Sequence, residues 1–108
     1  MSHHSNFDEI ALVDGAPRAS GTVQPQGDVD WMHVWIIQPQ GATFAAATGD
    51  WSGAPGSAWT VDTIKQPGSA DFTEGPAFAL AFASMSTRQP DGTTESTIQL
   101  WSETLSCV

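Results

Sequence analysis

The chain contains little positive charge and only one cysteine. Of its 108 residues, 3 are Lys or Arg and 12 are Asp or Glu, which gives a formal net charge of −9. Binding to a phosphate backbone or to anionic lipid depends on clustered Lys and Arg, so we expect neither nucleic acid nor a membrane surface as a partner. Cys107 has no second cysteine with which to form an intrachain disulfide or a zinc or redox motif.

Long apolar runs and motifs for known chemistries are also lacking. The longest apolar run covers residues 77–83, far short of the roughly 20 residues of a membrane-spanning helix. The first residues are polar, so we expect no signal peptide there, and the compartment stays undetermined. The sequence has no phosphate-binding glycine loop and no HExxH motif. We therefore predict no cofactor, and an enzyme is the less favoured interpretation.

The sequence is rich in turn signals that divide it into short segments. Gln-Pro is followed closely by glycine at residues 24–27, 38–41, 66–68 and 89–92. Proline sets the backbone for the second turn position, and glycine accepts the left-handed conformation that often follows. No segment between these turns has the period of an amphipathic helix, whereas several alternate with the period of a strand. The expected strands are 10–13, 19–24, 29–38, 42–48, 58–65, 77–88 and 93–104.

These features predict an all-β protein with a single-domain, two-sheet antiparallel sandwich of about seven strands over residues 8–108. Residues 1–7 are expected to be a flexible or vector-derived terminus. The length and strand count resemble an immunoglobulin-like or fibronectin-like sandwich, a resemblance of architecture only, and a small barrel is the alternative. The most clearly defined element is a hairpin of 77–88 with 93–104, closed by a type I turn and a glycine bulge.

The segment 29–38 is apolar on both faces. Residues two apart share a face of a strand, so Trp31, His33 and Trp35 lie together, opposite the aliphatic residues at 32, 34 and 36. A two-layer sandwich buries only one face of each sheet. The other apolar face therefore needs a loop such as 49–56, a second subunit or a ligand to cover it.

Two assignments of these faces are compatible with the sequence. In the first, Met32, Val34 and Ile36 lie in the core beside the large residues at 78, 80 and 82, and the tryptophans stand outside above the alanines of 77–83. In the second, the tryptophans lie in the core, as the third-strand tryptophan of a sandwich often does.

We predict from this a non-enzymatic binding or interaction module of unknown ligand, which self-associates or docks through an apolar, tryptophan-bearing sheet face. A homo-oligomer is the favoured outcome, since symmetric self-association commonly covers such a face. The alternative is a carbohydrate-binding module, because indole rings stack on sugars. Third is a small enzyme centred on His33 with Asp30. The predicted ligand or interface residues are Trp31, His33, Trp35, Trp51 and Trp59.

No metal ligand set is predicted. Asp28, Asp30 and His33 are close in sequence, but His33 points to the opposite face in a regular strand unless a bulge intervenes. Aspartates in the turns leave a calcium site open, although such residues more often bond to their own backbone.

Overall fold

The structure is a computed structural model, and it describes residues 5–23, 28–51 and 58–108. Within these ranges the chain is all-β, as predicted, and no helix is long enough and apolar enough to cross a membrane. The strands are β1 (Ser5–Val13), β2 (Ala16–Val23), β3 (Asp28–Gln40), β4 (Thr43–Trp51), β5 (Ala58–Asp62), β6 (Ile64–Lys65), β7 (Gly75–Arg88) and β8 (Thr94–Cys107).

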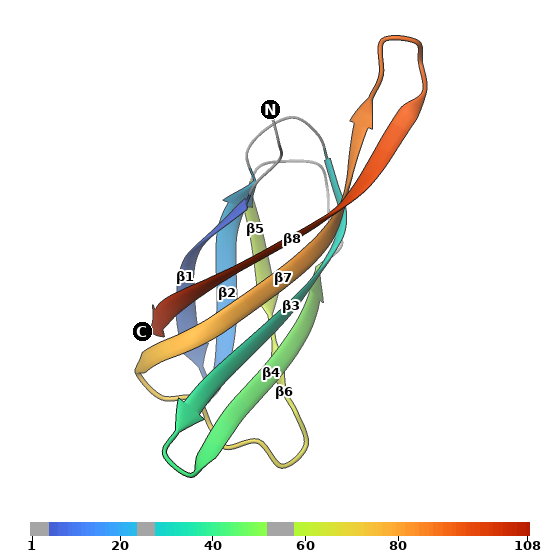
Figure 1. Ribbon diagram of the computed structural model, residues 1–108. Coiled ribbons are helices and arrows are strands. Elements are labelled where there is room, and N and C mark those ends of the chain that lie inside the picture. The colour runs from blue at the N-terminus through green and yellow to red at the C-terminus, as the bar shows by residue number, and fades with distance from the viewer. Residues whose placement is uncertain (1–4, 24–27, 52–57) are drawn as a thin grey trace.

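The strands form one continuous sheet (Figure 1), whereas the sequence predicts two sheets of about seven strands in all. The strand order is β5-β2-β1-β8-β7-β3-β4-β6 across eight strands. Neighbours pair antiparallel except β1 and β8, which are parallel and share the single registered pair Ile10 and Cys107. The fold therefore departs from an immunoglobulin-like sandwich, which has two sheets. Here the two layers of strands are opposite walls of one curled sheet.

The sheet curls into a nearly closed barrel because one stretch of chain joins its two outermost strands. β5 and β6 are separated only by Thr63, yet β5 pairs with β2 and β6 pairs with β4. The Thr63 hydroxyl donates a hydrogen bond of 2.6 Å to the carbonyl of Pro17, which fixes the bend. Gly49 in β4 permits the close approach of β5, since a Cβ there would lie 2.6 Å from Val61 Cγ1. Periodicity in the sequence does not reveal a strand that changes partners halfway.

The interior combines small side chains of β7 with large side chains from other elements. Over residues 77–83 of β7 the inward side chains are alanines, none more than 1% exposed: Ala77, Ala79, Ala81 and Ala83. Bulk comes from elsewhere in the chain, from Phe7, Trp59 and Phe72, which are buried in the same core. The alanines leave room for these rings, because a protein interior is close-packed and adding methylene groups to it is costly.

The large side chains of β7 therefore point outward, and the prediction that Phe78, Leu80 and Phe82 face the core is wrong. Directly paired residues share a face of the sheet, and Leu80 pairs with Trp35 while Ala79 pairs with Ile36. The other part of the same assignment is confirmed. The side chains at 32, 34 and 36 of β3 are fully buried, and the tryptophans at 31 and 35 stand outside, above large residues rather than a layer of alanine.

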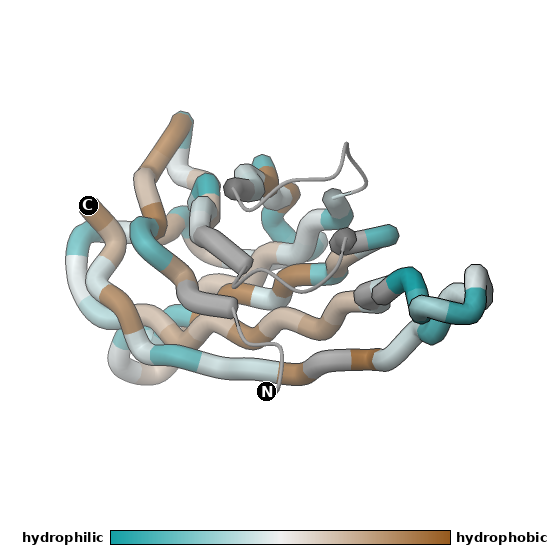
Figure 2. Tube along the Cα trace, turned by 90° about the horizontal axis from the view of Figure 1, so that it is seen from above, coloured by the Kyte–Doolittle hydropathy of each residue, from teal (hydrophilic) through white to brown (hydrophobic). Residues whose placement is uncertain are grey.

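The predicted hairpin is confirmed. β7 and β8 pair from Arg88 and Thr94 down to Gly75 and Cys107 without a register shift. The Gly92 amide donates to the Gln89 carbonyl at 3.0 Å, and Gly92 has a φ of 90°. The end of this hairpin projects beyond the rest of the sheet (Figure 1), and its tip is hydrophilic (Figure 2). The molecule is accordingly elongated, with extents of 54 × 23 × 20 Å.

Both ends of the described chain belong to the fold. β1 begins at Ser5, and Phe7 is buried in the core. Near the other end, Cys107 is a free, buried cysteine packed against the same core. Its burial raises the pKa of the thiol above the ordinary value, so this cysteine is not presented for cross-linking to a second chain.

Candidate functional site

The outward side of β3 is the starting point of the candidate site. Its side chains alternate, so Trp31, His33, Trp35 and Ile37 all lie on the outer surface. The two tryptophans are 41% and 40% exposed. These values are high for residues in the middle of a sheet, because both edges of β3 are already covered by β4 and β7.

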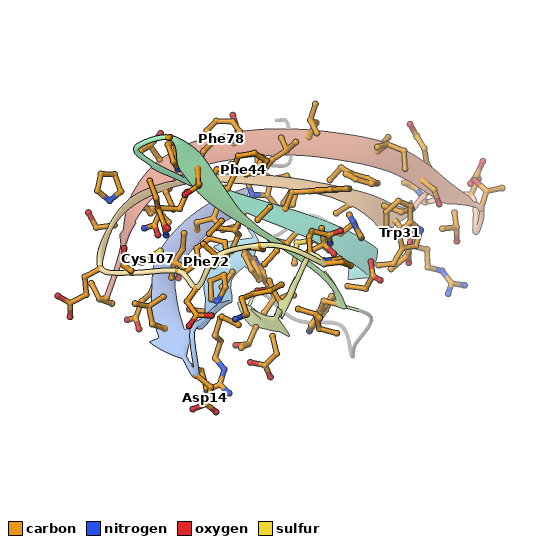
Figure 3. The ribbon with its side chains drawn as sticks, turned by 90° about the horizontal axis from the view of Figure 1, so that it is seen from below. Asp14, Trp31, Phe44, Phe72, Phe78 and Cys107 are labelled. Atoms are coloured by element: carbon orange, nitrogen blue, oxygen red, sulfur yellow. The ribbon has the colours of Figure 1, made fainter. Side chains whose placement is uncertain are left out.

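The neighbouring strands continue this surface in cross-strand rows. One row joins His33 of β3, Phe82 of β7 and Leu100 of β8, and another joins Ile37 to Phe78. Phe44 of β4 adjoins the end of β3 and lies on the same side as Phe78 (Figure 3). We call the combined surface the outer aromatic face. Its members are Trp31, His33, Trp35, Ile37, Phe44, Phe78, Leu80, Phe82, Ile98 and Leu100.

Two ring pairs of the outer aromatic face pack edge to face. Trp31 and Phe82 have ring centroids 5.6 Å apart with an interplanar angle of 88°. His33 and Trp35 lie 5.3 Å apart at 65°. Such T-shaped pairs are a favoured aromatic geometry. The surface is therefore ridged, and it suits burial against a complementary apolar surface better than flat stacking.

The exposed apolar area of this face is large for a small protein. Seven of its members are between 38% and 68% exposed: Trp31, Trp35, Ile37, Phe44, Phe78, Ile98 and Leu100. At about 200 Å² for each large side chain, they expose about 700 Å² together. The largest apolar patch on a typical monomer is about 300–600 Å², and one partner of a standard interface buries about 800 Å².

Charged groups lie at the borders of the outer aromatic face. Next to Trp35, the Nδ1 atom of His33 contacts the Oδ1 atom of Asp50 on β4. The His33 side chain is largely buried, whereas that of Asp50 is exposed. At one end of the face, Asp30 accepts hydrogen bonds from Ser84 at 3.2 Å and Ser86 at 2.5 Å. In this chain of formal charge −9, these two carboxylates therefore adjoin the face, one beside His33 and one at the end that carries Trp31.

The predicted pairing of His33 with Asp30 is not what the structure shows. A register shift between Val29 and Trp31 forms a bulge around Asp30, and the Asp30 carboxylate is held by serines of β7. His33 instead contacts Asp50, with Trp35 and Phe82 as its ring neighbours. These neighbours hold the imidazole within an open face of the sheet.

The other predicted tryptophans lie apart from the outer aromatic face. Trp59 is 3% exposed and packs edge to face on Phe7 inside the sheet, at 5.3 Å between centroids. Trp51 is half-buried against the core. Residues 52–57, which follow Trp51 and include most of the loop 49–56 considered as a cover, lie outside the described residues. The structure therefore brings together only Trp31, His33 and Trp35 of the predicted set.

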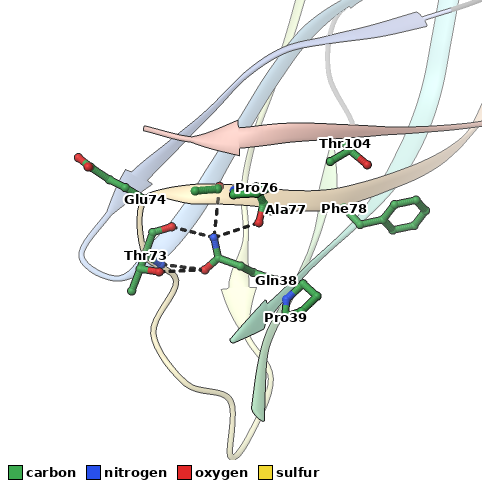
Figure 4. A pocket seen from close by; sticks show the side chains of 9 residues that line it. Gln38, Pro39, Thr73, Glu74, Pro76, Ala77, Phe78 and Thr104 are labelled. Carbon is green, nitrogen blue, oxygen red and sulfur yellow. Dashed lines mark hydrogen bonds between the residues drawn. The ribbon is translucent and has the colours of Figure 1, made fainter. Parts of the chain in front are cut away.

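A pocket of about 370 Å³ lies beside one end of the outer aromatic face. Phe78 and Pro39 form part of its wall, and Gln38 lies at its base (Figure 4). The buried Gln38 amide donates to the Thr73 carbonyl at 2.8 Å and accepts from the Thr73 amide at 2.9 Å. Because these bonds join β3 to the loop before β7, we assign Gln38 a structural role.

The described residues contain no group of three or more His, Cys, Asp or Glu side chains placed to hold a metal ion. Asp91, in one of the turns considered for calcium, is engaged locally. Its carboxylate accepts hydrogen bonds from the side chain and the backbone of Thr93, which lower its pKa below the ordinary value.

No known protein family, curated protein or solved structure matches this chain. The candidate site therefore depends on the geometry of the chain itself.

Most of the outer aromatic face lies beyond the residues that the sequence predicted. The missed residues are Phe44, Phe78, Leu80, Phe82, Ile98 and Leu100. One signal was available, because 77–83 alternates alanine with large residues and one of the two sets must face outward. The sequence could not determine which set, since that depends on the space left by strands distant in the chain.

Proposed function

We propose that this protein is a non-enzymatic interaction module that self-associates through the outer aromatic face. The observation that carries the proposal is the exposed apolar area of about 700 Å², which includes the side chains of Trp35 and Phe78. Depletion of charge and enrichment in aromatic residues characterise the buried centre of protein interfaces.

A second copy is the favoured partner because the face has the size of one side of a standard interface. Two copies that stack by these faces would bury them against each other as packed sheets do, with side chains interdigitating. The ridged surface formed by the T-shaped pair of Trp31 and Phe82 suits such interdigitation. The high net charge of each copy opposes association, so we expect the dimer to tighten as salt screens this repulsion.

The test is a matched pair of charge insertions followed by sedimentation analysis. Ile37→Glu places a carboxylate within the outer aromatic face, and Val13→Glu places one on β1, a different part of the sheet. The two positions are alike, at 38% and 39% exposed. We expect a dimer for the wild type and for Val13→Glu, and a monomer for Ile37→Glu. A monomeric wild type at all concentrations and salt levels would refute self-association.

A carbohydrate-binding module is the second candidate, supported by one feature of the site. The contact between His33 and Asp50 lies next to the exposed Trp35 ring, so polar groups for sugar hydroxyls adjoin an apolar ring surface. Titration of tryptophan fluorescence across a panel of glycans tests it. A saturable change that Trp35→Ala removes would support this function, and a flat response across the panel would exclude it for those glycans.

A further inference from the structure

The pocket beside Phe78 lies where two paired strands separate. The registered pairs of β3 with β7 end at Ile37 and Phe78. Beyond them, β3 continues beside β4, and β7 begins beside β8. Continuing the register of β3 with β7 would set Pro39 opposite Pro76. Proline has no backbone N–H to donate to a ladder, so the strands diverge here and the space between them becomes the pocket.

The polar group at the base of the pocket is already engaged. The Gln38 amide nitrogen donates to the Thr73 carbonyl at 2.8 Å, and its amide oxygen accepts from the Thr73 amide at 2.9 Å. Pro39 and Phe78 contribute apolar rings to the walls. Glu74 also lines the pocket, but its carboxylate points away from the Gln38 and Phe78 side chains (Figure 4). The pocket therefore suits an apolar ring better than a polar ligand, which would lose hydrogen bonds to water on entering.

The pocket is large enough for an aromatic side chain. Its volume is about 370 Å³, whereas an apolar cavity of about 150 Å³ can already bind benzene. The Phe78 side chain is 43% exposed, so its ring is available for an edge-to-face contact with a second ring. An aromatic side chain that fills a pocket is a common energetic centre of a protein interface.

The chain carries such an aromatic side chain beside the pocket. Phe44 is 63% exposed, the highest value among the Phe and Trp residues that the structure describes. It pairs with Pro39, which lines the pocket. Phe44 lies on the β4 side of β3, whereas Phe78 and Thr104 of the pocket lie on the β7 side. The ring and the pocket are therefore on opposite sides of the end of β3.

We propose that Phe44 of each copy inserts into the pocket of a second copy. This inference rests on the proposed self-association, and it identifies the side chain and the pocket that fix its geometry. A twofold interface is self-complementary, so a ring and a pocket that meet across it meet twice. The area of the outer aromatic face, about 700 Å² against about 800 Å² for one side of a standard interface, supports a second copy as the occupant.

The reciprocal contact determines where the twofold axis lies. The axis must pass midway between the ring and the pocket, which places it along the end of β3, close to Pro39. It then brings β4 of each copy over β7 of the other and keeps the strands of the two stacked sheets aligned, as in packed sheets generally. The same axis sets Ile37 near its counterpart, so Ile37→Glu places two like charges close together.

Disulfide formation between two different variants tests the contact. Phe44→Cys is mixed with Thr104→Cys, because Thr104 lines the pocket and is exposed. The second variant keeps its own Phe44, so the mixed dimer retains one of the two insertions. In the control, Ile98→Cys replaces Thr104→Cys; Ile98 is 62% exposed and lies about 20 Å further along β8. We expect the first mixture to form a cross-linked dimer at least about tenfold faster.

Sedimentation equilibrium supplies a readout without added cysteine. Phe44→Ala removes the ring, and Thr104→Trp fills the pocket from within its own copy. We expect each to raise the Kd of the dimer at least about a hundredfold. The double variant should be little weaker than either single variant, because both remove the same contact. Leu100→Ala is the control within the face, since Leu100 is 68% exposed, and its effect should be at least about tenfold smaller than that of Phe44→Ala.

The outcomes separate this inference from the proposed function. Equal cross-linking of the two mixtures, or a Phe44→Ala effect no larger than that of Leu100→Ala, would overturn the insertion. Additive effects in the double variant would overturn it as well, because the ring and the pocket would then act separately. If Ile37→Glu still dissociates the wild-type dimer in these cases, the proposed function stands. A wild type that remains monomeric at every concentration and salt level would overturn both.

Discussion

Trp35→Ala removes the largest exposed side chain near the middle of the outer aromatic face. The indole is 40% exposed, and a tryptophan side chain has about 250 Å² of surface, so about 100 Å² is available for burial by a partner. At about 25 cal/mol per Å², and allowing for the methyl group that remains, each copy loses about 2 kcal/mol of association free energy. A symmetric dimer loses this twice, or about 4 kcal/mol, which weakens the dimer about a thousandfold.

Sedimentation equilibrium of the wild type and the variant over a wide concentration range measures this change in Kd. Val13→Ala is the control, since Val13 has nearly the same exposed fraction as Trp35, 39% against 40%, but lies on β1. Loss of the contact between Trp35 and the His33 ring is expected to lower monomer stability by about 1 kcal/mol, so circular dichroism must show that the variant stays folded. A folded variant whose Kd changes less than about tenfold, or no more than that of the control, would refute the reasoning.

Four further outcomes are expected. Gly49→Ala should lower the free energy of unfolding by about 1–3 kcal/mol, because the added Cβ would collide with Val61 of β5. Chemical denaturation measures this change, and an unchanged midpoint would show that the space between β4 and β5 admits a methyl group. Gln38→Leu should cost about 1–3 kcal/mol, because it leaves polar groups of the loop before β7 without partners, and thermal unfolding would show the loss. Cys107 should resist iodoacetamide in the native state at pH 8 and react quickly in denaturant, because burial raises its thiol pKa above 9.0; rapid native alkylation would contradict this. The pKa of the Asp91 carboxyl should lie below its ordinary value of 3.8. Its contribution to the stability of the folded state is therefore fully present above pH 3.8, and this contribution is lost as the pH falls through the lowered pKa. In Thr93→Val an NMR titration should show this pKa rising toward 3.8.

Local sequence signals predicted the elements that depend on local physics. The Gln-Pro-Asp-Gly turn and the alternation on either side of it predicted the hairpin of β7 and β8, and Gly92 has the positive φ expected of a glycine bulge. The segment 29–38 was identified as apolar on both faces, which located the β3 side chains of the outer aromatic face. In each case the signal lies in a few consecutive residues, where turn chemistry and side-chain alternation act.

The tertiary structure decided the features that depend on residues far apart in the chain. Alternation in β7 is equally compatible with either face inward, and the bulk of Phe7, Trp59 and Phe72 decides that only alanine fits the interior. Likewise, Thr63 lets one extended segment pair with two different strands, so that one sheet curls upon itself where two sheets were predicted. The sequence by itself determined that this protein is built of strands, one of which has more apolar surface than a two-layer sandwich buries. Only the packed structure placed that surplus outside, because the volume enclosed by the sheet limits how many large side chains it can hold.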